Sequence, residues 1–281
     1  MKNFRDKTIV ITGAGSGLGR VFAAQLYQKG AKLALCDLDQ KGLEGTLQTT
    51  GDKGNRVKLF QVDVSDQSAM QEFAGQVESQ LGPADMLVNN AGICLIPQTF
   101  DETPDQQFKK VIDVNMWGAF YGIRAFLPQL RTRPEACIVN ISSLAGLVGL
   151  YGHAAYSMSK SALRGLSEAL QAELSGTQVH VLLVHPGGVQ TNLIKNAPNL
   201  EEKKRENAHK NFTEMSFLTP EKTVHRIIKA IQIKKNRAII GFDARLILVL
   251  RAIFPRSFPN ILRTIFSQAN FKDDPLWKKP R

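Results

Sequence analysis

Tyr156 and Lys160 lie four residues apart in a segment with helical spacing, 152–175, so they share one face of the expected helix. A tyrosine hydroxyl titrates at about pH 10, and a neighbouring ammonium group favours its phenolate form and lowers its pKa. A tyrosine poised nearer neutrality can take a proton from an alcohol or return one to a ketone. We therefore predict that Tyr156 is a general acid/base and that Lys160 assists it.

Two further polar residues could complete this chemistry. Ser143 ends an apolar strand pattern, and its hydroxyl could stabilise charge that develops on a substrate oxygen. Asn115 lies within an apolar helical stretch and could hold a water molecule that links Lys160 to solvent. A tyrosine and a lysine at this spacing are more commonly part of an amphipathic surface, so the interpretation depends on the rest of the chain.

Apolar, strand-like runs alternate with segments of helical spacing along the chain. The expected strands are 8–12, 32–36, 57–62, 85–89, 136–141, 179–184 and 237–241, and the expected helices include 17–29, 66–81, 104–130, 152–175 and 220–234. Strands that alternate with helices indicate a parallel sheet covered on both faces. The strands are continuous apolar runs, as in sheets that are buried on both sides.

A glycine-rich turn joins the first expected strand to the first expected helix. It spans Thr12–Gly19 and contains Gly13, Ser16, Gly17, Leu18 and Gly19. Glycines permit a tight turn and a close approach of the backbone to a pyrophosphate, which then rests on the helix N-terminus. The position between a strand and a helix favours nucleotide binding over an ordinary turn.

Asp37 follows the second expected strand, close to the spacing of about 20 residues expected for a ribose-binding acid. Its carboxylate would accept hydrogen bonds from ribose hydroxyls and repel a 2′-phosphate. Leu38 and Ser16 are uncharged, and no Arg or Lys is placed to meet a phosphate, so the sequence favours NAD over NADP. The alternative is that Asp37 only caps the next helix. Asp63 and Val64 close the third strand, where we expect the adenine ring.

The composition suits one intracellular α/β domain. The chain has 281 residues, of which 43% are hydrophobic. The three cysteines, Cys36, Cys94 and Cys137, have no metal-ligand spacing, and the five histidines are scattered, so we expect a reducing compartment and no metal site. Because no secretory leader or membrane-spanning apolar run is apparent, we expect a cytoplasmic protein.

The net charge of +11 is confined to the last third of the chain. Residues 1–190 hold 17 basic and 17 acidic residues, whereas residues 191–281 hold 19 and 8. The basic segment is interleaved with aliphatic residues rather than with aromatic residues suited to base stacking, so we expect no nucleic-acid partner.

Residues 242–281 form a basic extension beyond the last expected strand. Apolar residues recur at helical spacing with arginines between them, which predicts amphipathic helices. Three roles remain open: packing on the body or a partner subunit, covering an apolar pocket, and peripheral contact of 243–266 with an anionic membrane. The loop at about 191–217 is expected to be either a lid over the substrate or a flexible surface loop.

Over roughly residues 5–241, the sequence resembles the short-chain dehydrogenase/reductase family, in its NAD-preferring branch. The shared motifs, in order, are the TGxxxGxG turn at Thr12–Gly19, Asn89-Asn90-Ala91-Gly92, Ser143 thirteen residues before Tyr156, the YxxxK pair Tyr156/Lys160, and Pro186-Gly187-Gly188-Val189-Gln190-Thr191. No catalytic position departs from the pattern.

The resemblance implies a doubly wound, seven-stranded parallel sheet of Rossmann type with strand order 3-2-1-4-5-6-7. It implies that Tyr156 is the acid/base, that Lys160 binds the nicotinamide ribose, that Ser143 orients the substrate and that Asn115 completes a proton relay. The implied cofactor wall comprises Asn90, Ala91 and Gly92, with Pro186, Gly187, Val189 and Thr191 at the nicotinamide end. Homodimers or homotetramers formed through the helices 104–130 and 152–175 are implied as well.

The sequence thus predicts a catalytic domain, 1–241, that transfers hydride between NAD(H) and a secondary alcohol or ketone, followed by the extension 242–281. The apolar character of the substrate loop and of the extension favours a sterol, fatty or cyclic alcohol. The alternatives are a 3-oxoacyl-thioester reductase acting on acyl carrier protein or CoA derivatives, and a non-enzymatic NAD-binding sensor or scaffold.

Overall fold

The structure is a computed structural model, and it describes residues 1–191, 193–194, 197, 210, 213, 216 and 218–270, with side chains described up to residue 265. Most of the predicted substrate loop and the segment 271–281 lie outside the described residues. No helix in this described part of the chain has both the length and the apolar character needed to cross a bilayer.

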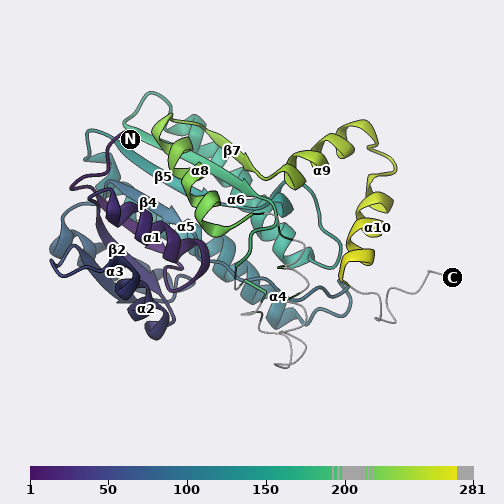
Figure 1. Ribbon diagram of the computed structural model, residues 1–281, viewed down its shortest axis with the longest axis horizontal. Helices are drawn as coiled ribbons and strands as arrows, with labels where there is room; N and C mark the ends of the chain where they lie inside the picture. The colour runs from purple at the N-terminus through teal and green to yellow at the C-terminus, as the bar shows by residue number, and fades with distance from the viewer. Residues whose placement is uncertain are drawn as a thin grey trace.

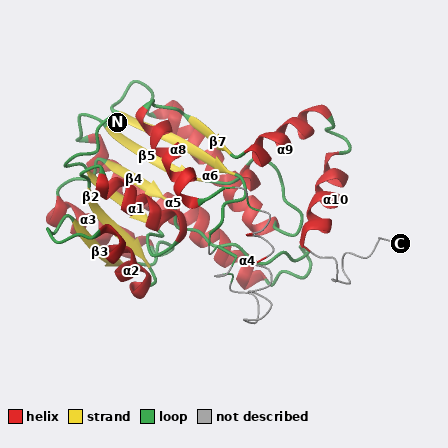
Figure 2. Cartoon of the chain, viewed as in Figure 1, coloured by secondary structure: helices red, strands yellow, loops and turns green. Residues whose placement is uncertain are grey.

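Seven parallel strands form a single sheet (Figures 1 and 2). The strands are β1 (Thr8–Thr12), β2 (Lys32–Asp37), β3 (Val57–Gln61), β4 (Met86–Asn89), β5 (Ala136–Ile141), β6 (Val179–Pro186) and β7 (Arg237–Ile240). Their order is β3-β2-β1-β4-β5-β6-β7, which confirms the predicted doubly wound, Rossmann-type fold. Each expected strand agrees with the observed one to within two residues.

Helices cover both faces of the sheet (Figure 2). They are α1 (Gly17–Gln28), α2 (Gln40–Thr50), α3 (Gln67–Leu81), α4 (Asp105–Ile112), α5 (Gly118–Arg131), α6 (Ala154–Glu173), α8 (Pro220–Gln232), α9 (Phe242–Ile253) and α10 (Phe258–Asn270). The segments named from the sequence do not include α2, whose weak apolar face buries Leu43 as its only large side chain.

The helix expected over 104–130 is interrupted in the middle. A π-helical turn, Asp113–Trp117, separates α4 from α5, and Asn115 is buried within it. Such turns widen the hydrogen-bond ladder by one residue and recur at functional sites. The backbone geometry at Asn115 therefore already suggests a functional position.

Alternate residues of each strand point to opposite faces of the sheet and pack in two hydrophobic cores, one on each face. Ile9 and Ile11 pack with α1, α2 and α8 in one core, whereas Val10 packs with α3 and α5 in the other. This is the two-residue period expected of a strand that is covered on both sides. The two cores hold the carboxyl ends of the strands at one edge of the sheet.

A smaller apolar cluster attaches α9 and α10 to the body. Ala244, Ile247, Phe258 and Leu262 of these helices are buried together with Leu144, Leu147 and Val148, which follow β5. The division of the chain at residue 241 stays a prediction, but the described part of the extension packs on the segment that follows Ser143. Both helices lie at the end of the molecule away from α2 and α3 (Figure 1).

Candidate active site

The strand order reverses between β1 and β4, and ligands of open α/β sheets bind at such a point, beyond the carboxyl ends of the strands. A cavity of about 880 Å³ lies there. Predicted site residues that line it are Gly13, Ser16, Gly17, Leu18, Asp37, Leu38, Asp63, Val64, Asn90, Ala91, Gly92, Ser143, Tyr156, Lys160, Pro186, Gly187, Val189 and Thr191. Two predicted residues do not line it: Gly19, which is buried in α1, and Asn115, which is buried behind Gly92.

The glycine turn is locked to the segment that follows β4. Asn90 Nδ2 donates to the carbonyl oxygens of Thr12 and Gly13 at 2.9 and 3.0 Å, and Thr12 Oγ1 accepts from the backbone N–H groups of Asn90 and Ala91. Gly13 has φ +64°, and a Cβ there would lie 2.7 Å from Ala91 Cα. Only glycine therefore permits this close approach of the turn to the segment after β4, and the turn leads into the N-terminus of α1, where a pyrophosphate could bind.

The carboxylate of Asp37 faces this turn. Its Oδ2 accepts from Gly15 N at 2.8 Å, and its Oδ1 accepts from Asp39 N at 3.0 Å. Asp39, not Asp37, is the N-cap residue of α2, so the alternative that Asp37 only caps that helix is not what the structure shows. Each oxygen of Asp37 keeps lone pairs that could accept from ribose hydroxyls.

Thr191 packs against the glycine turn. A Cβ built on Gly17 would be 3.5 Å from the Thr191 Cβ, which is ordinary packing distance. The segment leading to Thr191 is fixed by hydrogen bonds from Gly187 N to Ile240 O at 2.8 Å and from Gln190 N to Leu218 O at 3.0 Å. The loop after β6 therefore borders the same cavity as the turn after β1.

The Ser143 side chain lies beside the Tyr156 hydroxyl, close enough to influence its pKa by hydrogen bonding. Ser143 Oγ accepts from Ala145 N at 3.1 Å, so its hydroxyl hydrogen is free for the Tyr156 oxygen. Lys160 follows one turn along α6, with Nζ 5.7 Å from the centroid of the Tyr156 ring. Nζ donates to Ile141 O at 3.0 Å, which anchors the lysine to the end of β5. The structure thus brings the predicted serine, tyrosine and lysine together.

The predicted lowering of the Tyr156 pKa is not produced by the polypeptide alone. Burial raises the pKa of Tyr156 above its ordinary value, and hydrogen bonding by the Ser143 side chain opposes this effect. Burial also lowers the pKa of Lys160 to about 8. The sequence spacing placed the two groups correctly, but it could not show how strongly burial disfavours both charged forms.

Asn115 connects the segment after β4 to α6. Its Oδ1 accepts from Ile93 N at 2.8 Å, and its Nδ2 donates to Ile93 O at 2.9 Å and to Ser159 Oγ at 3.0 Å. Ser159 Oγ in turn donates to the backbone carbonyl of Tyr156. The side-chain amide is therefore used in positioning the backbone, and a water held by Asn115, as the sequence suggested, stays a prediction.

Two residues that sequence reasoning missed support the site. His185 is buried, and its Nδ1 lies 2.9 Å from the carbonyl oxygen of Ser143. Because a carbonyl only accepts, Nδ1 carries the hydrogen and Nε2 is left as a buried acceptor without a partner among the described residues. Asp243, the second residue of α9, accepts from Gly188 N at 2.7 Å through Oδ2. No local motif marks either residue.

Besides the predicted site residues, the lining of the cavity includes six large aliphatic side chains. They are Leu144, Leu150, Leu193, Ile194, Ile247 and Ile265. The last two come from α9 and α10, so the described extension supplies part of the cavity wall. This agrees with one of the three roles that the sequence left open for it.

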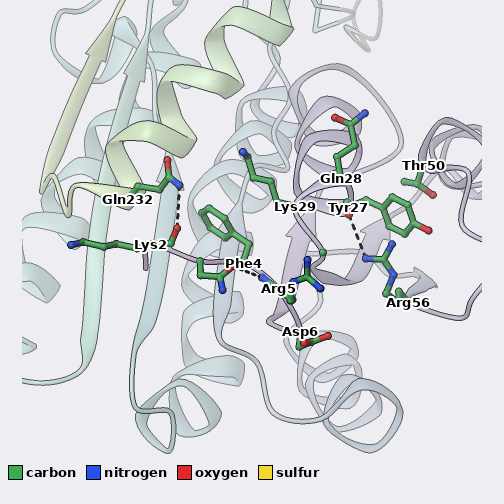
Figure 3. A pocket seen from close by; sticks show the side chains of 12 residues that line it. Lys2, Phe4, Arg5, Asp6, Tyr27, Gln28, Lys29, Thr50, Arg56 and Gln232 are labelled. Carbon is green, nitrogen blue, oxygen red and sulfur yellow. Dashed lines mark hydrogen bonds between the residues drawn. The ribbon is translucent and has the colours of Figure 1, made fainter.

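A second hollow lies at the other edge of the sheet and has a different character (Figure 3). Its lining comes from segments that precede β1, β2, β3 and β7, and it includes Lys2, Arg5, Lys29 and Arg56. The Arg56 guanidinium lies 3.9 Å from the centroid of the Tyr27 ring and donates to Ala31 O. The hollow contains no pair of side chains placed for proton transfer, so we assign the chemistry to the first cavity.

The sheet order, the glycine turn and the tyrosine–lysine helix define an α/β protein of Rossmann type. The family model for short chain dehydrogenases matches residues 7–202. An oxidoreductase of Mycobacterium tuberculosis, SadH, is 35% identical over 265 residues, covering 93% of this chain and 96% of its own. The 3-dehydrosphinganine reductase of Danio rerio is 38% identical over 189 residues, covering 65% of this chain and 56% of its own.

Among solved structures, a short-chain dehydrogenase/reductase from Burkholderia phymatum, crystallised in complex with NAD, matches with a TM-score of 0.82 and 28% identity. The match covers 93% of this chain and 97% of that one. The chain therefore belongs to the short-chain dehydrogenase family of oxidoreductases, as its motifs predicted.

Proposed function

We propose that this protein transfers hydride between NAD(H) and a secondary alcohol or ketone that is apolar, with Tyr156 as the general acid/base. The observation that carries the proposal is that one cavity joins the glycine turn and Asp37 at one end to Tyr156, Ser143 and Lys160 at the other. A cofactor that spans this distance would present its reactive ring beside the tyrosine.

The residues present fit NAD better than NADP. The turn at Gly13 has no room for a side chain, and Asp37 offers carboxylate oxygens for ribose hydroxyls. The nearby guanidinium of Arg20 donates through Nε to Thr46 Oγ1 and through Nη2 to Gly15 O and Gly42 O, which directs it to the protein backbone. When bound, NAD supplies the hydride acceptor or donor at C4 of its nicotinamide ring.

The roles of the side chains follow from their contacts. In alcohol oxidation, the Tyr156 oxygen takes the proton of the substrate hydroxyl, and in ketone reduction it returns that proton. Ser143 lies beside the Tyr156 hydroxyl and would donate to the substrate oxygen. Lys160 Nζ lies 5.7 Å from the centroid of the Tyr156 ring, where a protonated ammonium would favour the phenolate form and oppose the effect of burial. Asn115 positions Ile93 and, through Ser159, the backbone of Tyr156.

The substrate class rests on the large aliphatic side chains in the lining of the cavity. Burial of an apolar molecule against Leu150, Ile194 and Ile247 would supply binding energy in proportion to its area. Sterols, fatty alcohols and cyclic alcohols fit this description. The relative that is named a 3-dehydrosphinganine reductase is consistent with this class of reaction.

The test is the rate of NAD reduction at about 340 nm with secondary alcohols of increasing chain length and ring count, run in parallel with NADP. The proposal predicts turnover with NAD that rises with apolar size. Faster turnover of 3-oxoacyl thioesters with NADPH would favour the acyl-thioester alternative. Tight NAD binding with no turnover of any substrate would favour a sensor or scaffold.

We also propose that the protein forms a homodimer or homotetramer through the segments 104–130 and 152–175, which contain α4, α5 and α6. Trp117 and Met158 are exposed apolar residues at these helices, and Trp117 stacks with Tyr121. Sedimentation of the wild type beside a Met158→Glu variant tests this, because the variant should shift to a smaller species. The cytoplasmic location stays a prediction from the sequence.

A further inference from the structure

Helix α9 has two apolar faces, and only one of them is buried against other described residues of the chain. Ala244 and Ile247 are buried against the segment after Ser143. Phe242, Leu246, Val249 and Ile253 are all exposed. Their spacing of four, three and four residues places them in one straight stripe along the solvent side of the helix. We refer to these four residues as the outer stripe.

The surroundings of the outer stripe are cationic. Arg245 lies at its edge, because it is three residues from Phe242 and four from Val249. Arg256 is exposed just beyond the helix, next to the exposed Phe254. Neither arginine forms an ion pair with any acid in the part of the chain that is described. The one acidic residue of α9, Asp243, is turned inward to Gly188 N.

We propose that the outer stripe of α9 docks on an anionic lipid bilayer, with the helix lying in the plane of the interface. An amphipathic surface helix with basic flanks gains from burial of its apolar side chains and from attraction to anionic headgroups. A second copy of this chain is a poorer occupant. A symmetric contact through the stripe would bring arginines against arginines with no acid to pair them.

This docking places the cavity beside the membrane. Ile247 on the inner face of α9 and Ile265 of α10 both line the cavity, and Ile265 is partly exposed at its rim. An apolar substrate could thus pass from the bilayer to Tyr156 over a short apolar path. Only this last step rests on the proposed function, since the docking itself depends on the stripe and its charge.

The experiment is flotation of the full chain with vesicles, which needs no substrate. Vesicles of phosphatidylcholine alone are compared with vesicles that contain about 30% phosphatidylserine. We expect binding to the anionic vesicles that is about tenfold tighter than to the neutral ones and that weakens between about 0.1 and 0.5 M salt. The triple variant Leu246→Gln/Val249→Gln/Ile253→Gln should bind about 100-fold more weakly.

A matched pair of single variants provides the control. Ile253 is 61% exposed on the outer stripe, and Ile233 is 58% exposed at the end of α8, which precedes β7, whereas α9 follows β7. Ile253→Gln should weaken vesicle binding several-fold, whereas Ile233→Gln should leave it unchanged. Circular dichroism and NAD binding should be unaltered in all variants, so that loss of docking is separated from loss of fold.

Three results would overturn the proposal: no flotation with anionic vesicles, equal loss in Ile253→Gln and Ile233→Gln, or a triple variant whose free protein sediments as a smaller species. The last would assign the stripe to a contact between copies. Docking without turnover of any alcohol would leave this inference standing and contradict the proposed function instead.

Discussion

The side-chain amide of Asn115 forms two hydrogen bonds with the backbone of Ile93, accepting one and donating the other. Oδ1 accepts from Ile93 N at 2.8 Å, and Nδ2 donates to Ile93 O at 2.9 Å. These two bonds hold the preceding residue, Gly92, close to Lys160. A Cβ on Gly92 would lie 3.2 Å from Asn115 Oδ1 and 3.3 Å from Lys160 Nζ. The lysine is thus held by Ile141 O on one side and confined by Gly92 on the other.

Gly92→Ala should therefore displace the lysine. The added methyl group would be closer to Nζ than ordinary packing allows. The ammonium should therefore move away from Ile141 O, and Lys160 would be misplaced relative to Tyr156. We expect kcat to fall about tenfold, in line with the sensitivity of catalysis to small misplacements. Steady-state kinetics and a thermal unfolding curve measure the two effects separately.

Gly165→Ala is the matched control. Gly165 lies in α6, the same helix as Lys160, and an added Cβ would meet no atom within 4 Å. This variant should keep full activity and gain about 0.5–1 kcal/mol of stability from the higher helix propensity of alanine. Equal activity in the two variants would show that the space around Gly92 does not matter for the lysine.

Asp37→Ser should change the choice of cofactor. The substitution removes a negative charge and the acceptor of Gly15 N, which lies 2.8 Å from Oδ2. We expect kcat/KM with NAD to fall about 10–100-fold, as for loss of charged hydrogen bonds, and kcat/KM with NADP to rise. The ratio of the two constants is the measurement, and an unchanged ratio would contradict the assignment of Asp37 to the ribose.

Asp243 links the extension to the loop after β6 through its bond of 2.7 Å with Gly188 N. Asp243→Ala leaves that N–H without its acceptor, so the loop that leads to Thr191 should loosen. We expect KM for NAD to rise about tenfold. Asp243→Asn keeps a carbonyl oxygen in place and should retain most of the affinity. An equal effect of both variants would point to the charge rather than to the hydrogen bond.

His185 should make the stability of the protein depend on pH. Burial lowers the pKa of His185 to about 4, the neighbouring arginines Arg237 and Arg164 also lower it, and the bond with Ser143 O opposes them. Because the folded pKa lies below the unfolded value, the unfolded chain binds more protons between about pH 6.5 and 4. The free energy of unfolding should thus fall with falling pH in this window, by up to about 3 kcal/mol.

The comparison with His185→Asn isolates this effect. The asparagine nitrogen can donate to Ser143 O but does not titrate, so urea unfolding of the variant should lose less stability between pH 6.5 and 4. Carboxyl groups that titrate in the same range are common to both proteins and cancel in the difference. Identical pH slopes would show that His185 is not buried as a neutral group.

The strands of the sheet could be predicted from the sequence because each is marked by the hydrophobicity of its own residues and by the turn that follows it. A run such as Thr8–Thr12 is buried at every position, with three consecutive apolar residues at its centre, since both faces of the sheet are covered, and glycines follow it at once. The tyrosine and lysine could also be paired, since a helix alone brings residues four apart onto one face. These features depend on spacing within a single element or at one turn.

The remaining features depend on partners far apart in the chain. Asp243 contacts Gly188, 55 residues away in the sequence, and Asn115 contacts Ser159, 44 residues away. No sequence pattern near these residues predicts the contacts. The π-helical turn at Asp113–Trp117 leaves the apolar spacing almost unchanged, so periodicity alone predicted one helix there. The pKa of Tyr156 depends on burial, which spacing does not measure.

The most direct test of the account is the pair Tyr156→Phe and wild type, measured with NAD and the best secondary alcohol of the panel. The variant loses only the hydroxyl, so NAD binding should remain within about threefold, while kcat should fall about 100- to 10,000-fold because proton transfer is removed. Loss of kcat with intact NAD binding would support Tyr156 as the acid/base of this oxidoreductase. Near-full activity of Tyr156→Phe would contradict it.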